Sequence, residues 1–127
     1  MNVELELQKA IFTQLSSSSY KVNDGWFEGD ILPLITIGEV NLELNDTKVN
    51  DGWQLIVTVH TWSNKTSSLQ SKEMNHFVRE KLGLVEIQDY RVSSRLVRTV
   101  TLKEKDGDSI LHHGVTQYRY KILKEEI

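Results

Sequence analysis

The chain contains no cysteine. Disulfide bonds, thiolate nucleophiles and zinc sites built on sulfur are therefore excluded, and this composition is compatible with a reducing compartment. Long apolar runs are also missing, since none approaches the roughly 20 residues that a membrane-spanning helix needs. The first residues carry glutamates where a secretory signal would carry lysines, which argues against a signal peptide. We therefore expect no membrane partner.

An excess of positive charge is absent as well. The 15 lysines and arginines are outnumbered by 18 aspartates and glutamates, which gives a net charge of -3. Tight binding to the outside of nucleic acid needs a basic face, so this class of function is disfavoured. A chain of 127 residues with 39% hydrophobic and 26% charged residues is typical of one globular domain, here spanning residues 1–127.

Two segments have the apolar spacing of amphipathic helices. The first runs from residue 3 to about residue 15, and the four serines at 16–19 end it. Its expected buried stripe is Leu7, Ala10, Ile11, Gln14 and Leu15, widened by Leu5 and Phe12. The second helix opens at Ser67, where Gln70 completes a capping-box pattern, and Gly83 ends it. Its expected buried stripe is Leu69, Met74, Phe77, Val78 and Leu82.

The remaining apolar segments alternate as strands do. Short strands are predicted at 32–37, 39–44 and 84–87, and Pro33 belongs at the start or edge of its strand. The segment 53–62 is apolar on both faces, which predicts a central strand. Segments 91–103 and 110–123 form a hairpin around the Asp-Gly turn at 105–108. Together these elements predict an α+β fold, in which a mainly antiparallel sheet has both helices packed on one face.

One hexapeptide, Lys-Val-Asn-Asp-Gly-Trp, occurs at 21–26 and again at 48–53. Two copies with unrelated flanks cannot build a repeat architecture, which needs about three units. The simplest interpretation is one kind of Asn-Asp-Gly turn used twice, each followed by a tryptophan that re-enters the sheet. The alternative is a pair of equivalent contact sites for a partner.

The histidines do not form a recognisable catalytic or metal-binding pattern. His112 and His113 are adjacent on a strand and point to opposite faces, so they cannot share one metal. His76 follows Glu73 by three positions, but no second motif of this kind accompanies it. We therefore expect no metal, no cofactor and no enzymatic activity. The alternative is a small-molecule-binding or enzymatic α+β domain with a pocket near His60.

The order of segments resembles the tail-completion, or tail-terminator, proteins of long-tailed phages and prophages. The likeness covers nearly the whole chain and rests on the sequence of several motifs. The first motifs are the N-terminal helix, Tyr20-Lys-Val and the strand opened by Pro33. A strand that ends in Trp62-Ser63 then precedes the second helix. Last comes an acidic-Gly turn, followed by His112 and the tyrosine-rich segment 117–122. Leu34 stands where the family usually has an aromatic residue.

The resemblance implies a structural virion protein that caps the tail tube and joins the tail to the head. Its implied partners are other copies of itself in a six-membered ring, the tail-tube protein and the head connector or stopper protein. DNA would pass through the ring without specific binding. The implied location is the head–tail junction of the virion, with the host cytoplasm as the place of assembly, where the subunit can still be monomeric. Another head–tail connector or minor tail protein on a similar scaffold is the nearest alternative.

Interface residues are expected in the doubled hexapeptide, in the polar loop before its second copy and in the long hairpin. Aromatic residues and arginine are enriched at protein interfaces, and a long charged loop can reach a neighbouring subunit. The candidates are Trp26, Asp46, Lys48, Asp51, Trp53, Arg98, Tyr118 and Tyr120.

Overall fold

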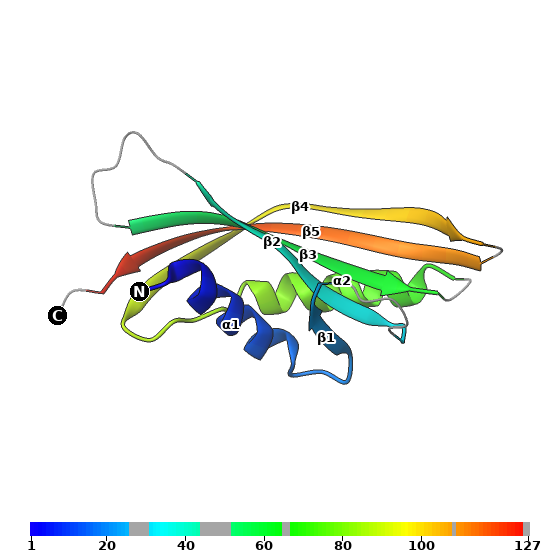
Figure 1. Ribbon diagram of the computed structural model, residues 1–127, viewed down its shortest axis with the longest axis horizontal. Coiled ribbons are helices and arrows are strands. Elements are labelled where there is room, and N and C mark those ends of the chain that lie inside the picture. Colours follow the sequence, from blue (N-terminus) through cyan, green and yellow to red (C-terminus); the bar gives the residue numbers. More distant parts are fainter. Residues whose placement is uncertain (26–30, 44–51, 65–66, 108, 126–127) are drawn as a thin grey trace.

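The computed structural model describes residues 1–25, 31–43, 52–64, 67–107 and 109–125. Two helices, α1 (Val3–Leu15) and α2 (Leu69–Leu82), lie on one face of a five-stranded sheet (Figure 1). The strands are β1 (Lys21–Asp24), β2 (Leu34–Glu43), β3 (Gly52–Ser63), β4 (Tyr90–Asp106) and β5 (Ser109–Lys124), arranged in the order β1-β2-β3-β5-β4. The predicted α+β class is confirmed. No helix among the described residues is long and apolar enough to cross a membrane.

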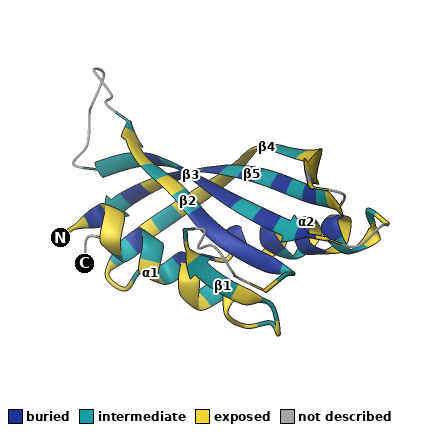
Figure 2. Cartoon of the chain, turned by 45° about the vertical axis from the view of Figure 1, so that its right-hand side comes forward, coloured by how far each residue is buried: buried dark blue, intermediate teal, exposed yellow. Residues whose placement is uncertain are grey.

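The sheet is antiparallel except at one edge, where β1 pairs with β2 in parallel. β3 lies between β2 and β5, as its two apolar faces predict. β4 and β5 form the predicted hairpin, and Gly107 supplies the positive φ of 65° at its turn. Buried and half-buried residues alternate along β5 (Figure 2), so only one face of the hairpin contributes to the core.

The first copy of the hexapeptide is not simply a turn. Lys21–Asp24 form β1, and the chain turns only at Gly25, which has a φ of 94°. Pairing with the buried start of β2 gives these backbone groups hydrogen-bond partners, and this outweighs the turn preference of Asn and Asp. Of the second copy, only Gly52 and Trp53 are among the described residues, and they begin β3.

Two further strand predictions are wrong. The strands expected at 32–37 and 39–44 are one strand, β2, with an irregularity between Ile37 and Val40. The strand expected at 84–87 is an irregular connection between α2 and β4. The apolar residues of this connection do not indicate a strand. They are present because Val85 packs into the core. The side chain of Gln14 on α1 donates a hydrogen bond to the carbonyl of Leu84 and holds the connection in place.

The first helix uses a narrower stripe than expected. Its buried residues repeat every four positions, and Asn2 caps its start by accepting a hydrogen bond from the backbone of Leu5. Leu5 and Phe12 were expected to widen the stripe, but their exposed fractions are 45% and 46%. Residues four positions apart lie along one narrow side of a helix, and only that side of α1 packs on the sheet. Leu5 and Phe12 lie outside it and face the solvent. The buried residues are Val3, Leu7, Ile11 and Leu15.

The predicted capping box of the second helix does not form. The hydroxyl of Ser67 does accept a hydrogen bond from the backbone of Leu69, where the helix begins. The side chain of Gln70, however, accepts from the hydroxyl of Ser63 at the end of β3 and so ties the helix to the sheet. Leu69 belongs to the first, outward-facing turn and has an exposed fraction of 63%.

Hydrogen bonds fasten both halves of α2 to the sheet. In its first half, Asn75 accepts from Thr61 on β3 at 2.7 Å and donates to Thr101 on β4 at 2.9 Å. This amide lies over Gly114 of β5, where a Cβ atom would collide with it. At its C-terminal end, the hydroxyls of Tyr118 and Tyr120 donate to the carbonyls of Arg79 and Leu82, at 2.9 and 2.6 Å. These bonds satisfy carbonyls that have no partner within the helix.

A bulge interrupts the regular alternation of side chains along β4. Leu96 pairs with Tyr118 and Arg98 with Gln117, so Val97 is an extra residue. The extra residue reverses the side on which the following side chains lie. Leu96 therefore shares the helix-covered face with Tyr118, whereas Arg98, Val100 and Leu102 lie on the opposite face.

We predict that Tyr120→Phe lowers the free energy of unfolding by about 1–3 kcal/mol, because it leaves the buried carbonyl of Leu82 without its donor. Burial raises the pKa of the Tyr120 hydroxyl, so it stays a donor throughout the accessible pH range. Urea unfolding followed by tryptophan fluorescence measures the change. Tyr90→Phe is the control, since that hydroxyl makes no hydrogen bond to any residue that the structure describes. An equal loss in both variants would contradict this role for Tyr120.

Candidate functional site

The face of the sheet that points away from α1 and α2 is the candidate functional surface, and we call it the open face. No described element covers it, and both helices lie on the other side (Figure 1). Cross-strand register places the same-face side chains of β2, β3, β5 and β4 next to one another here. One half of this face carries an aromatic and histidine cluster, and the other half carries cations.

Three titratable side chains from three strands are linked by hydrogen bonds on the open face. His60 Nδ1 lies 2.7 Å from His113 Nε2, and His113 Nδ1 lies 3.0 Å from Glu104 Oε1. We call this set the imidazole chain. It extends from β3 through β5 to β4 and so links the three strands through side chains.

Trp62 holds the imidazole chain flat against the sheet. It is the cross-strand partner of His113, and their rings stack at 3.8 Å between centroids with 10° between planes. The indole N–H donates to the hydroxyl of Thr36 on β2 at 3.1 Å, which fixes the ring. On the other side, His60 packs over Gly38, where a Cβ atom would come within 2.8 Å of Nε2. The absent side chain at Gly38 is thus what allows the imidazole to lie there.

The environment of His60 favours its neutral form. Burial lowers the pKa of His60, and the neighbouring charge of His113 on β5 lowers it further. Glu39 on β2 and Glu104 on β4 act in the opposite direction but do not prevail. We conclude that His60 is uncharged at neutral pH and that one of the two histidines donates to the other.

The other half of the open face carries four exposed cations, which we call the basic strip. Arg91 and Arg95 lie before the bulge in β4, Arg98 lies after it, and Lys121 lies across on β5. In the part of the chain that the structure describes, none of the four has an ion-pair partner. The nearby Arg119 differs, since its Nε donates to Glu43 at 3.1 Å.

Hydrogen bonds from Gln54 and Arg119 hold the carboxyl group of Glu43 in its charged form. A hydrogen bond from Gln54 is the main cause that lowers the pKa of Glu43, and Arg119 adds to it against the opposing effect of burial. This pair joins β2 to β5 across β3 on the open face.

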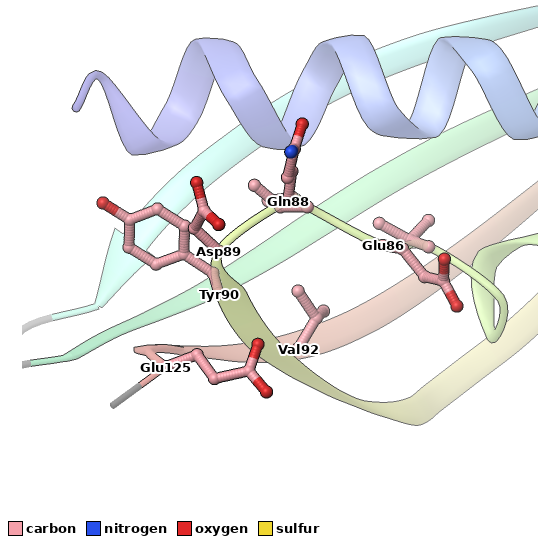
Figure 3. A pocket seen from close by; sticks show the side chains of 8 residues that line it. Glu86, Gln88, Asp89, Tyr90, Val92 and Glu125 are labelled. Atoms are coloured by element: carbon pink, nitrogen blue, oxygen red, sulfur yellow. The ribbon is translucent and has the colours of Figure 1, made fainter. Parts of the chain in front are cut away.

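A hollow of about 590 Å³ lies on the helix side of the sheet, where the connection from α2 enters β4 (Figure 3). Its carboxylates belong to Glu86, Asp89 and Glu125, and we call it the acidic hollow. Asp89 has a φ of 70°, a conformation that aspartate tolerates better than most residues. Its carbonyl accepts from the backbone N–H of Glu125 at 3.0 Å, which closes the hollow at the end of β5. The other lining residues are Val85, Ile87, Gln88, Tyr90 and Val92.

The predicted interface residues fall into three groups. Trp26, Asp46, Lys48 and Asp51 lie outside the described residues. Arg98 is exposed on the open face and belongs to the basic strip.

The three aromatic candidates among the described residues lie on the helix-covered face. Trp53 is half-buried beside the core, with its ring centroid 6.0 Å from that of Tyr90. Tyr118 and Tyr120 are buried, and their hydroxyls already bond to α2. The alternation of side chains along β5 explains the placement of the two tyrosines, because the even-numbered residues of this strand face α2.

The imidazole chain has no signal in the sequence. The prediction that His112 and His113 point to opposite faces is correct, since His112 is buried and His113 is not. The sequence does not pair His60 with His113, because the register between β3 and β5, which places Trp62 opposite His113, cannot be inferred from a local pattern. The two histidines meet diagonally, and only the observed register reveals such a contact.

No family model matches the chain, and no curated protein matches it in sequence. Among solved structures, a chain in the virion of the native gene transfer agent particle has the same fold. Its TM-score is 0.78 at 14% identity, over 95% of this chain and 97% of that one. The gp17 protein of bacteriophage SPP1 is similar with a TM-score of 0.63 at 21% identity, over 94% of this chain and 91% of that one. At these identities, the likeness is one of fold.

We predict that the free energy of unfolding falls as the pH is lowered from about 7.5 to about 5.5, and that His60→Gln reduces this fall. The folded state holds the pKa of His60 below its ordinary value. The unfolded chain therefore takes up a proton near pH 6.5, which the folded chain binds only at lower pH. Urea unfolding of both proteins at the two pH values measures the difference, and equal falls would refute the role of His60.

Proposed function

We propose that this chain is a structural, non-enzymatic protein of a phage or phage-derived virion. The observation that carries the proposal is the likeness of fold over nearly the full length of both chains, to a chain of the gene transfer agent virion and to gp17 of bacteriophage SPP1. The resemblance of the sequence to tail-completion proteins rests on different grounds, namely the order of its motifs. Two independent comparisons thus support the same class of protein.

We further propose that the protein closes the tail tube and joins it to the head connector as a six-membered ring. Each subunit of a ring needs two different contact surfaces, one for the neighbour on either side. The chain offers an uncovered sheet face and a long edge strand, β4. Exposed apolar side chains are present in the same hairpin, as expected at interfaces that remain to be buried. They are Leu96, Val97, Leu102 and Ile110.

The enzymatic alternative finds its best argument in the imidazole chain, but the geometry favours a structural role. His113 uses both ring nitrogens, one with His60 and one with Glu104. His60 uses Nδ1 for His113 and packs Nε2 over Gly38. Neither imidazole therefore has a nitrogen directed at a substrate, which general acid–base catalysis requires. The acidic hollow contains neither histidine.

Deletion of the gene from its native phage or prophage tests the proposal. We expect filled heads separated from tails, some of them of abnormal length, in negative-stain electron micrographs of the lysate. Supplying the wild-type gene in trans should restore joined particles and serves as the control. Normal joined virions from the deletion strain would rule out the head–tail junction as the place of action.

A further inference from the structure

We propose that the basic strip of one copy docks onto the acidic hollow of the next copy, and that this contact repeats around the ring. The inference rests on the proposed function, since it names the surfaces through which the subunits of that ring meet. Its partner is a second copy of this chain.

The basic strip presents its cations as one continuous surface. Arg91 and Arg95 point the same way because they are four residues apart on one strand. Arg98 would point the other way in a regular strand, but the bulge at Val97 turns it to the same side. Lys121 extends the strip onto β5, where it pairs with Ser93. All four side chains are exposed, so each can reach a partner without rearrangement of the sheet.

The acidic hollow has the complementary form. Its carboxylates stand around apolar lining residues, among them Val92 on β4 (Figure 3). An arginine side chain combines an aliphatic stem with a planar charged head. Such a side chain can therefore lay its stem on apolar surface while its guanidinium binds a carboxylate at the rim. All three carboxylate residues are exposed, and none has an ion-pair partner within the described ranges.

The two surfaces lie on opposite sides of the sheet, so one copy cannot join them to each other. Tyr90 and Val92 line the hollow from the helix side, while Arg91 between them points to the open face. A contact between strip and hollow therefore needs two copies in a head-to-tail arrangement. Head-to-tail contacts generate a ring when the rotation between copies closes, which is the assembly proposed for this protein.

A second copy accounts for the surfaces better than DNA does. A phosphate backbone would neutralise the basic strip but would leave the carboxylates of Glu86, Asp89 and Glu125, on the other side of the sheet, without a positively charged partner. A second copy neutralises both surfaces with one contact. It also leaves the assembled ring with the net negative charge of its subunits, which is compatible with DNA passing through without retention.

Charge reversal in a deletion strain tests the contact. The strip variant carries Arg95→Glu and Arg98→Glu, and the hollow variant carries Glu86→Lys and Glu125→Lys. We expect each to yield at least about tenfold fewer joined particles than the wild-type gene, because like charges then face each other. The combined variant, with all four changes on one chain, should restore joining. A matched control is Lys72→Glu with Lys103→Glu, two exposed lysines outside the strip, which should join particles normally.

Co-expression of the strip variant and the hollow variant gives a second test. In a ring with an even number of subunits, the two variants can alternate so that every contact pairs opposite charges. Joined particles should then reappear, although neither variant supports them alone. Such rescue requires that the paired charges belong to different copies.

Several results would overturn the contact while leaving the proposed function intact, because the wild-type gene still restores joining. One is normal joining by the strip variant alone. Another is loss of joining by both variants with no rescue in combination. A third is loss by the strip variant with normal joining by the hollow variant, which is the result expected if the strip binds DNA. If circular dichroism shows that the strip variant is unfolded, a milder variant with Arg95→Gln and Arg98→Gln replaces it. That pair should reduce joining, and full joining by it would equally overturn the contact.

Discussion

The attachment of α2 to the sheet is the constraint on which the rest of the structure depends. Asn75 inserts its amide between Thr61 and Thr101, and the Tyr118 and Tyr120 hydroxyls hold the helix end. Because such bonds must be satisfied once they are buried, the helix has one position on the sheet. Packing both helices on that face completes the core there and leaves the other face open.

The open face is ordered by its own side chains, although no described helix or strand covers it. Trp62 stacks on His113 and bonds to Thr36, and the imidazole chain ties β3, β5 and β4 together through side chains. The pair of Glu43 and Arg119 does the same at the other half of the face. A face fixed in this way is preorganised, so that a partner can bind it with little loss of conformational entropy.

A single extra residue gives the open face its charge. Without the bulge at Val97, Arg98 would share the helix-covered face with Tyr118, where a guanidinium would have to be buried. The bulge leaves Leu96 on the covered face and turns Arg98 to the open one, where it joins Arg91 and Arg95. Bulges of this kind often redirect side chains at functional surfaces. The same strand also carries its charges along a sheet edge, which discourages unspecific pairing.

The sequence by itself determined the elements whose patterns are long and local. The first helix, the central strand and the hairpin around Gly107 were predictable because periodicity and turn chemistry agree there. Only the tertiary structure decided the rest. The pairing of β1 with β2, the apolar connection at Val85, the bulge and the meeting of His60 with His113 all depend on register between distant segments. Local propensity carries no information on register, because a shift of one residue exchanges the two faces of a strand at no local cost.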